Sequence, residues 1–211
     1  MGCALEKEHR DLPASFYRSE TVIYSIQQLD TMKTHLIQLA YMEASRSPDP
    51  STQVGAVVAA HWETRLGIGT LALSAGHNHF PQGVPEEYWH DREKKYAHVI
   101  HAEASAILRL LGGHQLASPP MMHSKVLYGT WACCKQCALT IIESGVIEKL
   151  VVDRAPLDLN SSWRDQILES YDLLEANGIA VEMIYYDGPR YGIRFGGKVW
   201  EDGCQSTLQS S

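Results

Sequence analysis

Two short stretches of the sequence carry residue types that bind metals and move protons. The first, HVIHAEASAILRLLGG, places His101 and Glu103 two positions apart at the start of a run of helix-forming residues. On its own this pattern is ordinary, because acidic side chains favour the first turn of a helix, where free N–H groups attract negative charge. The second, GTWACCKQCALTII, places Cys134 and Cys137 three positions apart at the predicted start of another helix. Residues with that spacing share a helix face, so both sulfur atoms can reach one ion.

The two stretches complement each other chemically. Both open helices, and two strand–helix junctions in one α/β layer can bring their helix N-termini together. One histidine and two cysteines would then give zinc three protein ligands and leave a fourth position for water, as in catalytic zinc sites. Zinc lowers the pKa of bound water to roughly 7, and Glu103, which is not needed as a ligand, can carry the proton. Taken alone, the C-x-x-C pair could equally be a redox motif or small residues packed at a junction.

The composition limits the class of protein and its partners. The chain has 211 residues and a formal net charge of -7, which argues against a broad basic surface for nucleic acid. No apolar run is long enough to span a bilayer, so no membrane partner is expected, and the N-terminus does not read as a signal peptide. Three of the five cysteines fall within five residues, which fits a reducing compartment and a metal or reactive-thiol site. We therefore expect a cytoplasmic protein.

Strands and helices alternate along most of the chain. Helices are expected from residue 30 or 31 to the SRSPDPS segment, over 102–111, over about 134–143 and over 161–178. Strands are expected over 54–60, 71–76, 125–130, 149–153 and 179–186, the first two as an antiparallel hairpin with a long tip. This alternation predicts an α/β fold, a three-layer α/β/α sandwich in which a mixed five-stranded sheet carries helices on both faces. Residues 77–100 are predicted to form a long loop without regular structure.

The chain is expected to hold one domain between two flanking segments. Residues 1–30 lack a sustained period and are assigned to an N-terminal extension. Residues 31–187 contain the alternating elements and the candidate zinc site. Residues 188–211 are Gly-rich and polar at their end, and we expect them to pack as an irregular arm or to stay mobile.

The ordered motifs resemble those of the cytidine/deoxycytidylate deaminase superfamily, and most closely the deoxycytidylate (dCMP) deaminases. HAE followed by CCKQC matches the zinc-deaminase pattern H-x-E … P-C-x-x-C. The segments ASRSPDPSTQVGAVV, AGHNHFPQG and KYAHVIHAEASAI match further pieces of the dCMP deaminases in the same order. The resemblance covers roughly residues 31–187 and implies the cytidine deaminase-like fold.

The resemblance assigns roles to individual residues. His101, Cys134 and Cys137 would bind one catalytic Zn²⁺, and Glu103 would shuttle protons. Asn78 would hydrogen-bond the substrate sugar or base, and the segment 46–53 would lie near the substrate phosphate, although a plain helix-terminating turn would explain that segment as well. The substrate-binding residues expected on this basis are Asn78, Arg46, Ser47, Ala102, Thr130 and Trp131.

Four positions depart from the family pattern. Cys133 stands where the family has proline and leaves a spare thiol beside the zinc. Ser105 replaces a usual asparagine, His79 replaces the second glycine of the G-x-N-G loop, and His98 replaces an aromatic residue. None of these changes touches the metal ligands, but together they leave the identity of the base and of any regulatory site open.

The resemblance also implies an activity, partners and regulation. We expect hydrolytic conversion of dCMP to dUMP and ammonia by a homo-oligomer, a hexamer by resemblance, that dCTP activates and dTTP inhibits, with Mg²⁺ accompanying a regulatory nucleotide. Residues suited to such a triphosphate are His77, Gln82, Arg92, Lys94 and Lys95, although a charge run such as HDREKK is also typical of a solvated loop. The alternatives are a deaminase for a 5-substituted dCMP, a nucleoside or, against the acidic charge, a tRNA base, and a non-catalytic nucleotide-binding regulator on the same scaffold.

Overall fold

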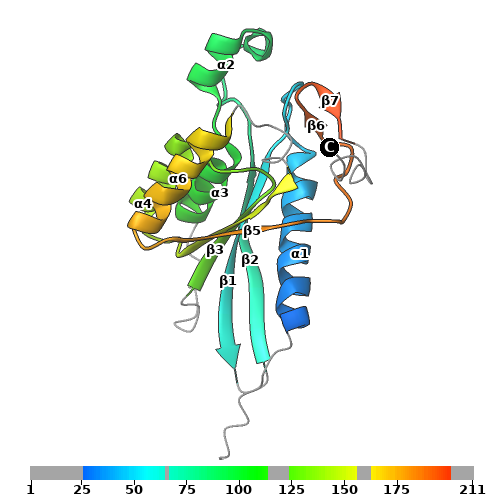
Figure 1. The fold of residues 1–211 in the computed structure, drawn as a ribbon. Helices are drawn as coiled ribbons and strands as arrows, with labels where there is room; N and C mark the ends of the chain where they lie inside the picture. Colours follow the sequence, from blue (N-terminus) through cyan, green and yellow to red (C-terminus); the bar gives the residue numbers. More distant parts are fainter. Residues whose placement is uncertain (1–25, 65–66, 114–123, 156–162, 201–211) are drawn as a thin grey trace, which may run out of the picture.

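A mixed five-stranded sheet forms the centre of the protein. The structure is a computed structural model that describes residues 26–64, 67–113, 124–155 and 163–200. The strands are β1 (Gly55–Thr64), β2 (Gly67–His77), β3 (Ser124–Gly129), β4 (Lys149–Asp153) and β5 (Ala180–Ile184). They lie in the order β2-β1-β3-β4-β5 (Figure 1). The predicted α/β class with a mixed five-stranded sheet is confirmed.

The pairing of the strands explains why their sequences are so apolar. β1 pairs antiparallel with both β2 and β3, whereas β3, β4 and β5 run parallel. The first half of β1 is buried on both faces, from Ala56 to Ala60, because helices cover both sides of the sheet. The predicted hairpin is confirmed, but its tip is shorter than predicted. The strands continue to Thr64 and resume at Gly67, with a register shift between Val58 and Ala59.

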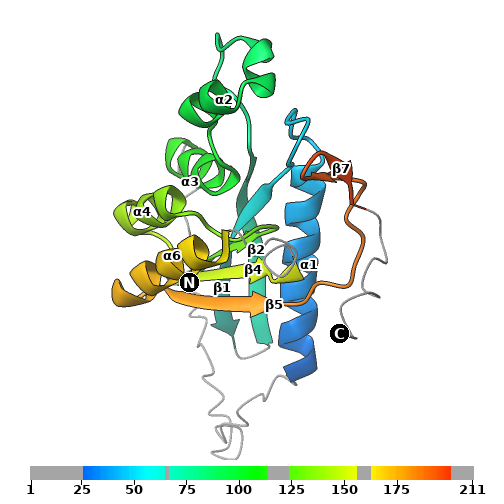
Figure 2. The same ribbon diagram turned by 45° about the horizontal axis from the view of Figure 1, so that its top comes forward.

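Helices cover the two faces of this sheet unequally. α1 (Ile26–Ala44) packs on one face, while α3 (Ala102–Gly112), α4 (Lys135–Ser144) and α6 (Arg164–Ala176) pack on the other (Figures 1 and 2). The buried apolar residues accordingly form two clusters, one on each side of the sheet. The predicted three-layer arrangement is confirmed.

Two glycines let helices approach the sheet at backbone distance. A Cβ atom on Gly55 would lie 2.0 Å from the carbonyl oxygen of Ala40 in α1, and one on Gly76 would lie 2.4 Å from the backbone nitrogen of Ala106 in α3. Neither position has room for a side chain. The height of α3 above the sheet is therefore set by backbone contact, and α3 carries His101 at its N-cap and Glu103 in its first turn.

The connection between β2 and α3 is more ordered than predicted. It contains the 3₁₀ helix η2 (Glu86–His90) and the short helix α2 (Arg92–His98), which projects beyond the sheet (Figure 1). The side chain of Asp91 caps α2 by accepting a hydrogen bond from the backbone N–H of Lys94. The prediction of a loop without regular structure over 77–100 is wrong, because a helix of two turns is too short to show a clear period.

Residues after β5 return across the molecule to the side of α1. There β6 (Arg194–Phe195) and β7 (Lys198–Val199) form a small antiparallel hairpin (Figure 2). Its two-residue loop is Gly196-Gly197, with φ angles of 57° and 81°. Two-residue hairpin loops of this type need positive φ at both positions, which glycine adopts without strain. Ile193 and Trp200 flank the hairpin and are buried in the α1-side cluster.

Both ends of the chain extend beyond the described residues. Residues 1–25 of the expected extension over 1–30 lie outside the described residues, as do residues 201–211 of the tail, whereas residues 26–30 form the start of α1. Within the described part of the chain, no helix combines the length and the apolar composition that crossing a membrane requires.

Candidate active site

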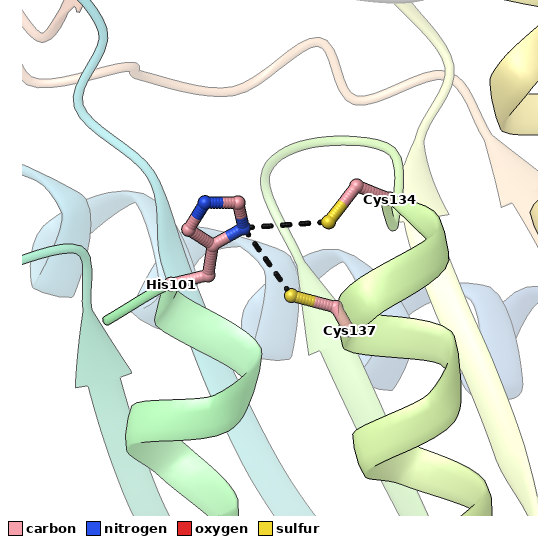
Figure 3. A group of neighbouring side chains, drawn as sticks. All are labelled: His101, Cys134 and Cys137. Atoms are coloured by element: carbon pink, nitrogen blue, oxygen red, sulfur yellow. Dashed lines mark hydrogen bonds between the residues drawn. The ribbon is translucent and has the colours of Figure 1, made fainter. Parts of the chain in front are cut away.

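Three candidate metal ligands meet between the N-termini of α3 and α4. His101 is the N-cap residue of α3, Cys134 is the N-cap residue of α4, and Cys137 lies in the first turn of α4. Their side chains point toward one another from the two helices (Figure 3). The Nδ1 atom of His101 lies 3.4 Å from the Sγ atom of Cys134 and 3.3 Å from that of Cys137. The proximity predicted from two separate helix starts is present.

This donor set fits a zinc ion in its geometry and its chemistry. The three ligand atoms all lie within 4.8 Å of one another. Tetrahedral zinc with Zn–S bonds of about 2.3 Å and Zn–N bonds of about 2.0 Å separates neighbouring N and S ligands by about 3.5 Å, close to the observed distances. Hydrogen bonds from Cys137 and from His101 lower the pKa of Cys134 to about 4. The set therefore supplies a thiolate, which is the form that binds metal.

Glu103 lies next to the ligands without belonging to the set. Its side chain is buried, and its Oε2 atom lies 3.5 Å from the Sγ atom of Cys137. Burial raises the pKa of Glu103, and the negative charge of Cys134 adds to that effect. A raised pKa makes this carboxyl group a stronger base than an ordinary glutamate, which suits a group that accepts protons and releases them again.

A cavity of about 200 Å³ opens beside these four residues. Its walls come from seven segments: the loop before β1, the residue after β2, the end of α2 and the residues after it, the start of α3, the loop before α4, the start of α6, and the C-terminal hairpin. The lining residues are Asp49, Thr52, Val54, Asn78, Lys95, Tyr96, Val99, His101, Ala102, Glu103, Trp131, Ala132, Cys134, Trp163, Ile167, Phe195 and Gly196. A concave site with a few convergent polar groups is the usual form of a small-molecule site.

The loop before β1 is held in place by the carboxylate of Asp49. This carboxylate accepts hydrogen bonds from Ser51 and from the backbone N–H of Thr52. It also accepts from the side-chain amide of Asn78, at 2.9 Å, and pairs with Lys95, whose Nζ atom lies 2.6 Å from Oδ2. We call this group of five residues the Asp49 hub. It ties the loop to the end of β2 and to α2.

The structure separates the expected substrate-binding residues into two groups. Asn78, Ala102 and Trp131 line the cavity, whereas Arg46, Ser47 and Thr130 are outside its lining. The Arg46 side chain is 68% exposed and pairs with Glu43 instead.

The residues outside the lining have partners of their own. The Ser47 hydroxyl donates to the backbone oxygen of Asn78, and Thr130 bonds the backbone of Gly55. The amide of Asn78 is itself engaged, since its nitrogen donates to Asp49 and Thr52 and its oxygen accepts from Val54.

The five residues expected to bind a regulatory nucleotide differ in their surroundings. His77 bonds the carboxylate of Glu43 at 2.8 Å, and Lys95 belongs to the Asp49 hub and lines the cavity. Gln82, Arg92 and Lys94 lie exposed on and before α2. Lys95 is thus placed at the candidate active site instead of at a separate surface.

Cys133, the spare thiol, is not part of the candidate metal-ligand group. It is fully buried and its Sγ atom contacts the backbone oxygen of Cys134 at 3.3 Å. Burial raises its pKa well above the ordinary value, so this thiol stays protonated and packs as a small apolar residue.

Several cavity residues were missed from the sequence, above all Phe195 and Gly196. The local signal was present: the sequence RFGGKV places two glycines between short runs suited to strands, which is a hairpin pattern. Trp163 and Ile167 come from the start of α6 and Tyr96 from α2. No pattern within the sequence predicted that these side chains would lie near His101.

Comparison with known proteins identifies the family of this chain. Residues 30–153 match the family model of the cytidine and deoxycytidylate deaminase zinc-binding region, which covers more than half of the chain. The chain belongs to the cytidine and deoxycytidylate deaminase family. The matched range contains His101, Glu103, Cys134 and Cys137, so a hydrolytic deaminase with a zinc-binding region is the class of protein to which this site belongs.

Individual relatives agree with the family. An uncharacterized deaminase in the luxG 3′ region of Aliivibrio fischeri is 34% identical over 71% of this chain and 91% of its own length. Deoxycytidylate deaminase from Mus musculus is 28% identical over 54% of this chain, and the match spans 60% of that enzyme. Among solved structures, Aspergillus oryzae Rib2 deaminase, at 18% identity and a TM-score of 0.51, shares the fold over 72% of this chain and 84% of that one.

Proposed function

We propose that this protein is a zinc-dependent deaminase that converts dCMP to dUMP and ammonia. The observation that carries the proposal is a group of three metal-ligand side chains, His101, Cys134 and Cys137, beside a cavity that the buried carboxyl group of Glu103 also lines. His101, Cys134 and Cys137 would hold the ion. When bound, zinc supplies Lewis acidity, which makes water nucleophilic at neutral pH.

Glu103 carries the protons of this reaction. Water adds to C4 of the cytosine ring, the C4–N bond breaks, and the products are uracil and ammonia. Glu103 takes a proton from the attacking water and delivers it to the ring nitrogen. It then takes the proton of the new C4 hydroxyl group and delivers it to the leaving amino group, as the C4 carbonyl forms. Its carboxyl group is suited to this task because it faces the cavity and is shielded from bulk water.

Lys95 is the residue that we assign to the substrate phosphate. Among the described residues, the cavity lining contains one lysine and no arginine. The Nζ atom of Lys95 lies 2.7 Å from the hydroxyl of Ser51, so the charged donor at the wall stands beside a hydroxyl group of the loop before β1. Such groups bind phosphate oxygens. This assignment replaces Arg46, whose side chain lies outside the cavity.

A nucleoside is the second candidate substrate, and one observation favours it. The charge of Lys95 is already compensated by Asp49, at 2.6 Å. A phosphate would have to share this lysine with a carboxylate, whereas an uncharged nucleoside would leave the ion pair intact.

A substrate panel decides between the two candidates. We expect kcat/KM for dCMP to exceed that for deoxycytidine by at least about tenfold, because phosphate contacts also stabilise the transition state. The panel should include CMP and 5-methyl-dCMP, and the loss of absorbance on deamination gives the rates. If deoxycytidine reacts as well as dCMP, the nucleotide assignment fails and the nucleoside assignment takes its place.

A matched pair of variants tests the phosphate contact itself. Lys95→Met should raise KM for dCMP and leave KM for deoxycytidine nearly unchanged. Lys94→Met is the control, since Lys94 is exposed and pairs only with Asp91 among the described salt bridges. Equal effects of Lys95→Met on both substrates would assign Lys95 a structural role in the Asp49 hub. The expected hexamer and its dCTP and dTTP response stay predictions, measurable by light scattering and by the same rates with added effectors.

A further inference from the structure

The C-terminal hairpin forms one wall of the candidate active site. Phe195 of β6 and the adjacent Gly196 line the same cavity as His101 and Glu103. The ring of Phe195 packs against Trp131, with centroids 4.3 Å apart and planes inclined by 35°. Trp131 lies three residues before Cys134, so this aromatic pair reaches from the hairpin to the candidate metal ligands.

The hairpin is attached along the loop that precedes β1. The backbone N–H of Gln53 donates to the oxygen of Arg194 at 2.9 Å, and the side-chain oxygen of Gln53 accepts from the N–H of Arg194 at 2.8 Å. The N–H of Gly197 donates to the oxygen of Ser51 at 2.7 Å, at the tip of the hairpin. These bonds fix Phe195 relative to the Asp49 hub, which shares the cavity.

The residues that flank the hairpin pack in the buried cluster on the α1 side of the sheet. Arg190, which is 3% exposed, donates to Asp153 at the end of β4 and to the backbone oxygen of Tyr186. Its guanidinium group lies 4.6 Å from the ring centroid of Trp200, which follows β7. A segment anchored at its tip and at its base holds its side chains in a defined place.

We propose that Phe195 is a specificity-determining residue, whose ring together with Trp131 packs against the nucleoside part of the substrate. The inference rests on the proposed function and adds a substrate contact from outside residues 30–153, the range that the family model matches. The chemical reason is that a pyrimidine ring and a deoxyribose present flat or apolar faces, and aromatic side chains bind such faces by stacking. Phe195 takes no part in moving protons, so it should affect binding and leave the chemical step intact.

The test compares Phe195→Ala with a control on the same hairpin. We expect Phe195→Ala to raise KM for dCMP by about 5- to 50-fold, with kcat within about threefold of the wild type. Zinc content and thermal midpoint should be unchanged within error. Val199→Ala, in β7, changes an exposed residue that is outside the cavity lining, and should leave KM unchanged. Phe195→Tyr, which keeps the ring, should restore KM.

The outcomes separate the inference from the function on which it rests. An unchanged KM in Phe195→Ala, in an enzyme that deaminates dCMP, overturns the inference and leaves the function standing. An equal rise of KM in Val199→Ala also overturns it, because the effect would then come from the hairpin as a whole. Wild-type protein that deaminates no pyrimidine in the panel overturns the proposed function and this inference with it.

Discussion

The two faces of the sheet bury charged groups in opposite ways. On the face of α1, the carboxylate of Asp153 is fully buried and accepts hydrogen bonds from Tyr41 at 2.6 Å, from Arg190 at 3.3 Å, and from the backbone of Ala155 and Tyr186. On the face of α3 and α4, the side chain of Glu103 has one hydrogen bond among those described, from the sulfur of Cys137. One carboxylate is fully paired and the other opens onto a cavity.

This difference separates a group that stabilises the fold from a group to which we assign the proposed chemistry. A buried network whose members all have partners makes a structure rigid. Burial and the charge of Asp153 raise the pKa of Tyr41 well above its ordinary value, so Tyr41 acts only as a neutral donor there. A buried carboxyl group with few partners, beside a cavity, has the features of a functional site. Replacing Glu103 by its amide should therefore lower activity, whereas replacing Asp153 by its amide should lower stability.

The largest effect is expected for Glu103→Gln. The amide keeps the size of the side chain but cannot accept and deliver protons, so turnover of dCMP should fall by about 10²–10⁴-fold. Zinc content, measured by elemental analysis, should stay at one ion per chain, since Glu103 lies outside the ligand set. Cys137→Ala is the contrasting variant and should lose zinc together with activity. Near-normal turnover in Glu103→Gln would contradict the proton-carrier role of Glu103 and show that the protons take another route.

A smaller effect, on stability alone, is expected for Asp153→Asn. Removing one partner of a buried ion pair leaves Arg190 uncompensated and should lower the free energy of unfolding by about 3–5 kcal/mol. Urea denaturation measures this loss, and activity should be retained at low temperature. Glu169→Gln is the control, because its salt bridge with Lys135 is exposed on both sides and should contribute about 0–1 kcal/mol. Equal losses for the two variants would contradict the distinction between the faces.

The smallest effect is expected for Glu43, which bridges the two regions from the end of α1. It pairs with His77 of β2, Arg109 of α3 and Arg46. Burial raises the pKa of Glu43, but the hydrogen bond with His77 and the charge of Arg46 outweigh burial and hold the pKa below its ordinary value of 4.5. Glu43→Gln should therefore lower the free energy of unfolding by about 1–2 kcal/mol at pH 7.

The pH dependence of this variant has a definite sign. A carboxyl group whose pKa is lower in the folded state contributes stability above its unfolded-state pKa, and that contribution disappears as the pH falls through the folded-state value. The difference between wild type and Glu43→Gln should therefore be full above pH 4.5 and shrink below it. Glu87→Gln, at an exposed position of η2, should show no such trend. A difference that grows on acidification would contradict the assignment.

The fold could be predicted where a segment is long or uniformly apolar. The strand Lys149–Asp153 was predicted with its observed bounds, because KLVVD is a short apolar run between two predicted helices. In the structure, all of its residues after Lys149 are buried. α2 was missed because it has seven residues. The hairpin at Gly196-Gly197 was missed although its two glycines are a turn signal. Each of its strands has two residues, which is too few to add an alternating pattern to that signal.

The candidate metal ligands could be predicted because their placement is a property of helix starts. His101 and Cys134 both occupy N-cap positions, and the topology of one layer brings those positions together. The binding residues could not be predicted in the same way, because their orientation depends on distant partners. Arg46 turns toward Glu43 on α1, while Lys95 turns toward Asp49, which lies 46 residues away in the sequence.

The Asp49 hub has a consequence for the thermodynamics of ligand binding. Its hydrogen bonds join the loop before β1, the end of β2 and α2 to one carboxylate that is 2% exposed. These walls are already ordered in the free protein, so a ligand that enters the cavity loses little affinity to the ordering of the chain. The heat-capacity change of binding should consequently reflect the apolar area of the ligand and its contacts alone, without the large negative value that accompanies coupled folding.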